Sequence, residues 1–241
     1  TPPARLHPHP LPESFSMRRS TLRPESLPGG RLARAAQAAA AAAPDTKPGK
    51  KTAAPAASKG SGEIRIIGGQ WRRTRLAVAQ RPGLRPTPDR VRETLFNWLG
   101  QDLTGWHCLD AFAGTGALGL EAASRRAAKV VMVESNRQTA RSLQQAAHTL
   151  TLPQVEIVCS DGLTYLNQTQ QHFDVVFLDP PFAWQQWPQL FDLLAGRLNH
   201  GAMVYVEAGK LPERPTGLLP YREGKAGMSR FELLLYSQVA E

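Results

Sequence analysis

The chain has 241 residues, of which 41% are hydrophobic and 20% charged, a balance typical of a globular protein. No run of about eighteen apolar residues occurs, so we expect no membrane-spanning segment and a cytoplasmic location. Cys108 and Cys159 both lie in apolar runs, which predicts two buried thiols rather than a disulfide, and the six histidines form no cluster that would bind a metal.

The net charge of +9 is concentrated in the N-terminal third. Residues 1–60 contain ten basic and three acidic side chains, and residues 61–92 contain eight and two. The remainder, 93–241, contains eleven and fifteen. A basic surface on one part of a protein indicates a polyanionic partner, although a basic tail can also serve solubility alone.

Residues 1–60 are rich in Pro, Ala, Gly and Arg and contain few large apolar side chains. Such a segment cannot bury enough surface to offset its chain entropy, so we predict a disordered basic tail. Met17 is a candidate translation start, and the Arg-rich composition also resembles an organelle transit peptide.

Residues 61–104 are predicted to form a small extension. Ile64–Ile67, the pair Gly68-Gly69 and Arg75–Val78 indicate a short hairpin. Thr87-Pro88 then predicts a helix start with threonine as the N-cap and proline at the first helical position.

From Gly105 onward, strand-like and helix-like segments alternate. This alternation predicts a Rossmann-like α/β fold with a doubly wound, mostly parallel sheet. Two final strands with no room for a helix between them predict a C-terminal antiparallel hairpin. The expected strands are Cys108–Phe112, Val130–Glu134, Val155–Cys159, Val175–Leu178, Met203–Val206, Leu218–Glu223 and Arg230–Tyr236; the expected helices are Ala117–Arg126, Asn136–Leu150, Gly162–Asn167 and Trp187–Leu198.

Three of the predicted parallel strands end in acidic side chains. Asp110 opens a glycine-rich loop that leads into a helix, Glu134 ends the next strand, and Asp161 follows the third. Glycines let the backbone approach a ligand closely, and an acid at the end of the second strand can accept ribose hydroxyls. The predicted cofactor-binding residues are Asp110, Phe112, Gly114, Gly116, Glu134, Ser135, Asp161 and Gly162.

Asp110 also helps to choose the cofactor. A dinucleotide site brings pyrophosphate to the helix N-terminus, where a carboxylate would repel it. S-adenosylmethionine has no phosphate and carries a positive sulfonium and ammonium. It therefore fits the loop better than NAD.

The segment Asp179-Pro180-Pro181-Phe182 is the most specific motif of the chain. Prolines fix the backbone and remove N–H donors, which leaves rigid carbonyl acceptors next to the carboxylate. Two acceptors beside a flat aromatic ring suit a planar base that bears an amino group. Alternatively, the prolines simply end a strand.

This motif resembles the (N/D)PP(Y/F) motif of amino-methyltransferases, and the loop from Asp110 to Gly116 resembles their cofactor loop. The runs that begin at Ile64 and at Leu84 are similar to the RsmD family of bacterial small-subunit ribosomal RNA guanine 2-amino methyltransferases. The resemblance spans about 63–236 and implies a methyltransferase domain over 105–241, a guanine in 16S RNA as target, and a 30S particle or assembly intermediate as partner. It also implies that Arg85, Thr87 and Arg90 border the cleft.

The residues themselves indicate that arginines of the extension hold RNA phosphates, namely Arg65, Arg72, Arg73 and Arg75. We expect a monomer. Three alternatives remain at this stage: an adenine amino-methyltransferase acting on DNA or other RNA, an RNA-binding assembly factor without turnover, and an NAD-dependent dehydrogenase.

Overall fold

The computed structural model describes residues 62–78 and 87–237, so the expected tail at 1–60 and Arg85 lie outside it. The described residues belong to one compact unit, Lys59–Glu241. Its elements are β1 (Gly62–Arg65), β2 (Arg75–Val78), α1 (Asp89–Trp98), β3 (His107–Asp110), α2 (Ala117–Ser124), β4 (Lys129–Val133), α3 (Arg137–Thr149), β5 (Val155–Val158), α4 (Gly162–Gln168), β6 (Phe173–Leu178), α5 (Trp187–Ala195), β7 (Leu198–Ala208), β8 (Leu218–Ala226) and β9 (Ser229–Tyr236).

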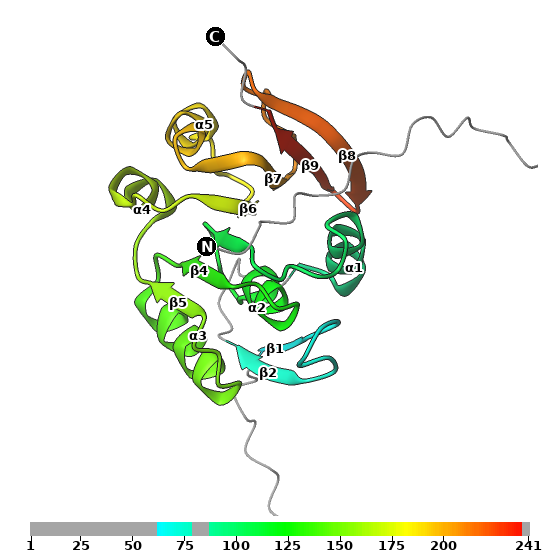
Figure 1. Cartoon of the computed structure of the whole chain (residues 1–241), viewed down its shortest axis with the longest axis vertical. Helices are drawn as coiled ribbons and strands as arrows, with labels where there is room; N and C mark the ends of the chain where they lie inside the picture. Colours follow the sequence, from blue (N-terminus) through cyan, green and yellow to red (C-terminus); the bar gives the residue numbers. More distant parts are fainter. Residues whose placement is uncertain (1–61, 79–86, 238–241) are drawn as a thin grey trace, which may run out of the picture. The chain divides into compact units, whose positions relative to one another are not determined.

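Seven strands form one sheet in the order β5-β4-β3-β6-β7-β9-β8 (Figure 1). The five strands from β5 to β7 in that order run parallel, and β9 is antiparallel to both β7 and β8. The chain moves outward from β3 to β5 and then returns to the other side of β3 with β6. The strand order therefore reverses at β3, where open α/β sheets bind their ligands. The predicted doubly wound sheet and its C-terminal hairpin are confirmed.

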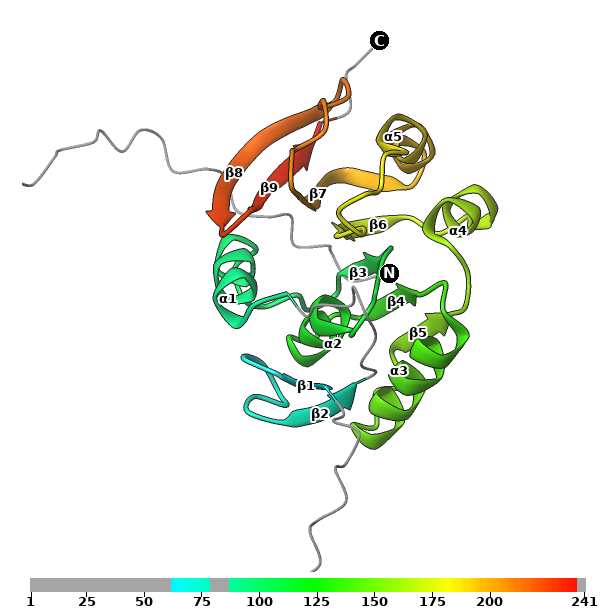
Figure 2. The same cartoon turned by 180° about the vertical axis from the view of Figure 1, so that it is seen from behind.

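Helices cover both faces of this sheet, as its apolar strands predict. One face packs against α1, α2 and α3, and the rings of Phe96 and Phe177 lie 5.9 Å apart there. The other face packs against α4 and α5 through side chains such as Leu166 and Leu190. Figures 1 and 2 show α4 and α5 on the opposite side of the sheet from α1 and α2. With both faces covered, the strand ends are where polar groups gather.

Residues 62–78, the first part of the extension, form the predicted hairpin. Strands β1 and β2 pair antiparallel, with Ile64 opposite Leu76, and both side chains are buried. Gly69 has φ +71°, and a Cβ built on it would lie 2.0 Å from the carbonyl oxygen of Ser124. Only glycine fits here, because the turn of the hairpin lies directly on the end of α2.

Helix α1 begins one residue later than the sequence predicts. Pro88 is the N-cap, with φ −56° and ψ 145°, and no side chain caps the helix. The expectation that Thr87 is the cap is wrong, because its hydroxyl instead donates a hydrogen bond to Asp179. Val91 and Leu95 of the helix and Leu99 at its C-cap are buried, at the four-residue spacing of one helix face.

Two further expectations are corrected. Cys108 is buried, but Cys159 is exposed because β5 ends at Val158 and the thiol lies beyond the strand. Helix α5 ends at Ala195 rather than at Leu198, since Leu198 pairs with Phe173 as the start of β7. None of the helices in the described ranges combines the length and the apolar character needed to cross a membrane.

Candidate active site

Three carboxylates lie side by side at the carboxyl edge of the sheet. Asp110 ends β3 opposite Phe177, and Leu178 of β6 is opposite Val206 of β7. Asp179 directly follows the end of β6, and Glu207 is the next residue of β7. Because alternate residues of a strand face the same way, the side chains of Asp110, Asp179 and Glu207 share one face of the sheet.

Asp110 is 1% exposed, and only part of its hydrogen-bonding capacity is used. Its Oδ2 accepts a hydrogen bond from the backbone N–H of Gly119 at 3.0 Å, whereas its Oδ1 is buried with no partner among the described residues. Burial raises the pKa of Asp110 to about 7; the backbone N–H groups of Gly119 and Phe112 counteract part of this rise, and the Glu134 carboxylate makes a smaller contribution to it. A buried carboxyl oxygen without a donor is costly in a folded protein.

Asp179 is held from one side by Thr87, whose hydroxyl donates to its Oδ2 at 3.2 Å. Burial, together with the Glu207 and Asp110 carboxylates, raises the pKa of Asp179 to about 8, although the hydrogen bond from Thr87 counteracts part of the rise. Glu207 in turn accepts a hydrogen bond of 2.7 Å from the hydroxyl of Tyr205. No cationic side chain within the described ranges pairs with Asp110, Asp179 or Glu207, so the cluster is short of positive charge.

The loop after Asp110 has the geometry that its glycines predict. Gly114 and Gly116 have φ of +51° and +81°, a region that favours glycine. Glu134 fixes this loop, because one of its carboxyl oxygens accepts from the N–H of Gly114 at 3.0 Å and the other from the N–H of Asn136 at 2.7 Å. The predicted acid of the second strand therefore has a structural role, and each oxygen retains a free lone pair.

The remaining predicted cofactor residues lie around the ends of β3, β4 and β5. A Cβ on Gly162 would lie 2.9 Å from the carbonyl oxygen of Ala111, and the next nearest group would be the ring of Phe112. The exposed Asp161 is the N-cap of α4, and its hydrogen bonds with Thr164 lower its pKa. Ser135 is exposed beside Glu134. The structure thus brings Phe112 and Gly162 together and gives Asp161 the capping role that a lone acid at a strand end commonly has.

The Asp179–Phe182 segment follows β6 and uses only part of its hydrogen-bonding capacity. The carbonyl oxygen of Pro181 accepts from the N–H of Trp184 at 2.8 Å, whereas that of Pro180 accepts no such bond among the described residues. Phe182 is 63% exposed, unusual for such a large apolar ring. A carboxylate, a free carbonyl and an open aromatic face follow one another within four residues.

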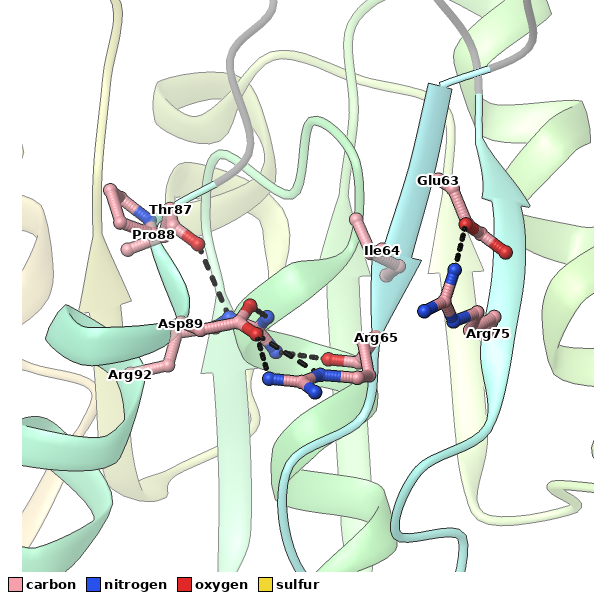
Figure 3. A pocket seen from close by; sticks show the side chains of 8 residues that line it. All are labelled: Glu63, Ile64, Arg65, Arg75, Thr87, Pro88, Asp89 and Arg92. Carbon is pink, nitrogen blue, oxygen red and sulfur yellow. Dashed lines mark hydrogen bonds and ion pairs between the residues drawn. The ribbon is translucent and has the colours of Figure 1, made fainter. Parts of the chain in front are cut away.

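A cavity of about 380 Å³ adjoins this segment through Thr87 (Figure 3). Arg65 and Arg75 of the hairpin line it, each paired with an acid: Arg65 with Asp89 at 2.7 Å and Arg75 with Glu63 at 3.1 Å. These four side chains are at least two-fifths exposed, so the ion pairs are weak and the arginines remain available to a stronger anion.

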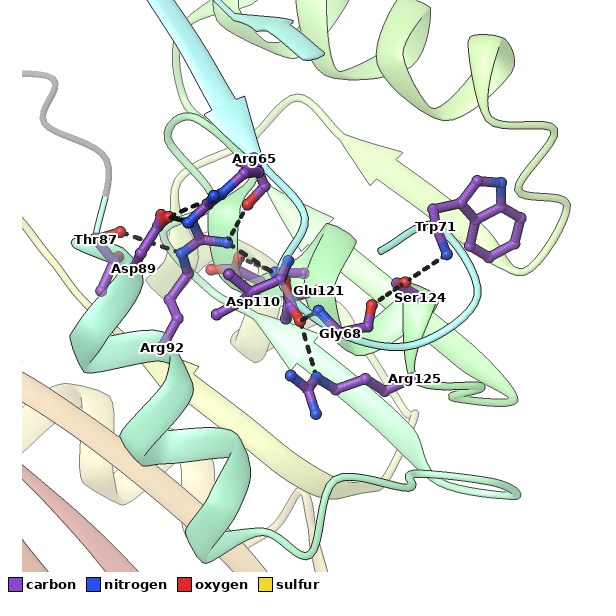
Figure 4. A network of polar contacts seen from close by, with 12 residues as sticks. Arg65, Gly68, Trp71, Thr87, Asp89, Arg92, Asp110, Glu121, Ser124 and Arg125 are labelled. Atoms are coloured by element: carbon purple, nitrogen blue, oxygen red, sulfur yellow. Dashed lines mark hydrogen bonds and ion pairs between the residues drawn. The ribbon is translucent and has the colours of Figure 1, made fainter. Parts of the chain in front are cut away.

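Glu121 of α2 ties the hairpin to the rest of the protein (Figure 4). Its fully buried carboxylate accepts from the backbone N–H groups of Ile67 and Gly68 at 2.9 and 2.7 Å. It also pairs with Arg92 at 3.3 Å and with Arg125 at 2.9 Å. Arg92 donates in addition to the carbonyl of Thr87, so one buried carboxylate connects α2, the hairpin and the start of α1.

The other predicted RNA-binding arginines are spread along the extension. Arg72 and Arg73 are exposed in the turn of the hairpin, whose neighbour Trp71 is bound through its N–H by the Ser124 hydroxyl at the last residue of α2. They therefore lie at the end of α2 away from Asp179. Arg90 is exposed on the first turn of α1.

The sequence prediction missed Glu207 and Tyr205. The expected strand Met203–Val206 stopped one residue before an acid, although acids also follow or end the three strands that were assigned to the cofactor. That repeated pattern was the available signal. The Glu121 network had no such signal, since an acid inside an apolar helix has no recognisable partner until the hairpin is placed. Among the described residues, no group of His, Cys, Asp or Glu is arranged to hold a metal.

The chain is similar to proteins of known name over most of the described region. The family model described as conserved hypothetical protein 95 matches residues 64–235. The ribosomal RNA small subunit methyltransferase D of Escherichia coli K12 is 44% identical over 179 residues, which covers 72% of this chain and 90% of that protein. The protein of the same name from Haemophilus influenzae is also 44% identical, over 67% and 93% of the two chains.

Solved structures give the same result. An Escherichia coli protein aligns with a TM-score of 0.68 at 39% identity, over 73% of this chain and 99% of that one. A Thermus thermophilus protein aligns with a TM-score of 0.60 at 28% identity, over 72% and 99%.

We predict that Glu121→Gln destabilises the protein by about 3 kcal/mol, because it leaves the buried guanidinium groups of Arg92 and Arg125 without their shared anion. Urea unfolding followed by circular dichroism measures this change. Glu156→Gln removes the partner of Lys129 in an exposed pair and should cost less than about 1 kcal/mol. Equal losses in the two variants would contradict the role assigned to Glu121.

We predict that Asp110→Asn is more stable than the wild type at pH 8. Because the pKa of Asp110 is raised from 3.8 to about 7 in the folded state, ionisation favours the unfolded chain as the pH rises from about 4 to about 7. The shift sets an upper limit of about 4 kcal/mol on the effect. The loss of unfolding free energy between pH 5 and pH 8 should be smaller in the variant than in the wild type; a variant with the wild-type slope would refute the assignment.

Proposed function

The chain belongs to the RsmD family of small-subunit ribosomal RNA methyltransferases, and from this membership we propose that it transfers a methyl group from S-adenosylmethionine to the 2-amino group of a guanine in 16S RNA. The observation that carries this proposal is the grouping of the Asp179 carboxylate, the free carbonyl of Pro180 and the exposed ring of Phe182 at one edge of the sheet. The carboxylate and the carbonyl can accept hydrogen bonds from an amino group, and the aromatic ring can stack on a planar base.

The residues at the edge fit S-adenosylmethionine. Asp110 has a buried carboxyl oxygen with no donor, and the acids around it have no cationic partner among the described residues. A ligand with a sulfonium and an ammonium but no phosphate would supply the missing positive charge. Glu134 and the Gly114–Gly116 loop would hold its ribose and methionine portions, and Phe112, Asp161 and Gly162 would hold its adenine. When bound, it supplies an activated methyl group.

Asp179 and Pro180 would orient the target amine. An exocyclic nitrogen is a weak nucleophile, because its lone pair is delocalised into the ring. Hydrogen bonds from its two N–H groups to the carboxylate and the carbonyl favour a pyramidal nitrogen and stabilise the positive charge that develops on it. Phe182 would stack on the base, which must leave its own stack to reach the edge, and such stacking is worth about 1–3 kcal/mol. Fixed alignment of the two reactants provides the rest of the rate enhancement.

Arginines of the extension would position the RNA. Arg65 and Arg75 line the cavity beside Thr87, whose hydroxyl bonds to Asp179, whereas Arg72 and Arg73 lie at the far end of α2. The arrangement suits a backbone that extends over several nucleotides, as in a 30S particle or an assembly intermediate.

Incubation of the protein with a labelled methyl donor and 30S particles, naked 16S RNA or duplex DNA tests this function. We expect N2-methylguanosine in the RNA of the particles. Label in N6-methyladenosine, or in DNA alone, would contradict the proposal.

We predict that Asp179→Ala reduces methyl transfer at least 100-fold, because the amine loses its anionic acceptor, while the affinity for S-adenosylmethionine stays near that of the wild type. Single-turnover rates and calorimetry measure the two quantities. Asp192→Ala on the exposed face of α5 is the control. Wild-type rates in Asp179→Ala would remove this residue from the chemistry.

We also predict that S-adenosylmethionine binds more tightly as the pH rises from 6 to 8.5. The pKa of Asp110, about 7, means that the empty site holds a proton which a cationic ligand displaces. Calorimetry in buffers of different ionisation enthalpy should detect its release. S-adenosylhomocysteine lacks the sulfonium charge and should show a weaker dependence; identical pH profiles for the two ligands would count against the charge argument.

We predict that Arg72→Ala combined with Arg73→Ala weakens RNA binding and lowers the slope of log K against log salt by about 1–2. The control is Lys129→Ala with Arg141→Ala, which removes the same charge from the start of β4 and from α3. An unchanged salt slope in the hairpin variant would show that its turn does not contact RNA.

A further inference from the structure

Glu207 is a nearly buried carboxylate beside the proposed amine site. It belongs to the end of β7 and follows Val206, which is paired with Leu178 directly before Asp179. Its side chain is 8% exposed. One oxygen accepts the hydroxyl hydrogen of Tyr205 at 2.7 Å, and the other has no partner within the described residues.

The fold gains no stability from a charge at this position. Two buried acids away from the site have cationic partners: Glu121 has two arginines, and Glu232 is bound by Arg214 at 2.8 Å. Glu207 has only a neutral hydroxyl and faces Asp179, whose pKa it raises. A glutamine could accept the same hydrogen bond from Tyr205 without the repulsion between two carboxylates. The charge itself therefore points to a ligand.

Tyr205 holds this carboxylate in one orientation. Its side chain is fully buried, and its ring lies 6.2 Å from that of Phe231. Burial and the Glu207 charge raise the pKa of Tyr205 well above its ordinary value, so the hydroxyl keeps its proton and remains a donor. The bond occupies one oxygen of Glu207 and leaves the other to a group that enters the site beside Asp179.

We propose that Glu207 selects guanine by accepting its N1–H while Asp179 accepts from the 2-amino group. This inference rests on the proposed function and names the residue that reads the base. The N1–H and the 2-amino group are neighbouring donors on one edge of guanine, and two neighbouring carboxylates are the matching acceptors. Adenine has a lone pair at N1, which the Glu207 carboxylate would repel. The pair of acids therefore discriminates against adenine at the site where it binds guanine.

Replacement of the target guanine by 2-aminopurine tests this role, because 2-aminopurine keeps the 2-amino group and lacks the N1–H. Particles are reconstituted with 16S RNA that contains either base at the nucleotide the wild-type protein methylates. We expect the wild type to lose roughly 10- to 100-fold in kcat/KM on 2-aminopurine, the range for one lost base contact.

Glu207→Gln supplies the second half of the comparison. It should lose a similar factor on guanine and show little further loss on 2-aminopurine, since the contact is already absent. Tyr205→Phe should reduce the discrimination in part, and Glu213→Gln, an exposed acid in the following loop, should behave as the wild type. Urea unfolding should show that Glu207→Gln folds at least as stably as the wild type.

Two outcomes would overturn the inference: a wild type that methylates both bases equally, or a Glu207→Gln variant that keeps the full wild-type discrimination. A wild type that methylates neither base would instead refute the proposed function. The two failures are therefore separable.

Discussion

Repulsion among Asp110, Asp179 and Glu207 is the constraint on which the rest of this account depends. Three parallel strands end in acids on one face of the sheet, and none of these carboxylates has a cationic partner among the described residues. Such a grouping costs folding free energy, so it is expected only where a ligand later supplies the positive charge and the donors. A cationic methyl donor and an aromatic amine together bring both.

The buried charge of Glu121 has the opposite character. Two arginines and two backbone N–H groups satisfy that carboxylate, and replacement of any partner leaves an orphan inside the protein. Glu121 acts by fixing the positions of other groups. By holding the hairpin on α2 and by binding Arg92, which donates to the carbonyl of Thr87, it places the Thr87 hydroxyl against Asp179. The paired carboxylate of Glu121 therefore stabilises the framework, whereas the unpaired carboxylates of Asp110, Asp179 and Glu207 lie at the proposed active site.

Sequence reasoning predicted the fold well because strand–helix alternation leaves few topologies, and it located the Asp110 loop and the Asp179 motif from local patterns alone. Sequence reasoning was wrong or incomplete where the role of a side chain depends on a partner that is distant in the sequence. Thr87 has the sequence signature of an N-cap, yet its hydroxyl bonds to an acid 92 residues away. Glu207 was missed for a related reason, since its meaning depends on a neighbouring strand. The roles of the hairpin arginines remain predictions.

Carbon-13 NMR titration of the aspartate and glutamate carboxyl groups tests the central claim most directly. The account predicts that Asp110 and Asp179 titrate near neutral pH in the free protein and that Asp110 loses its proton at that pH when S-adenosylmethionine is added. Carboxyl groups that all titrate below about pH 5, with no response to the ligand, would contradict it.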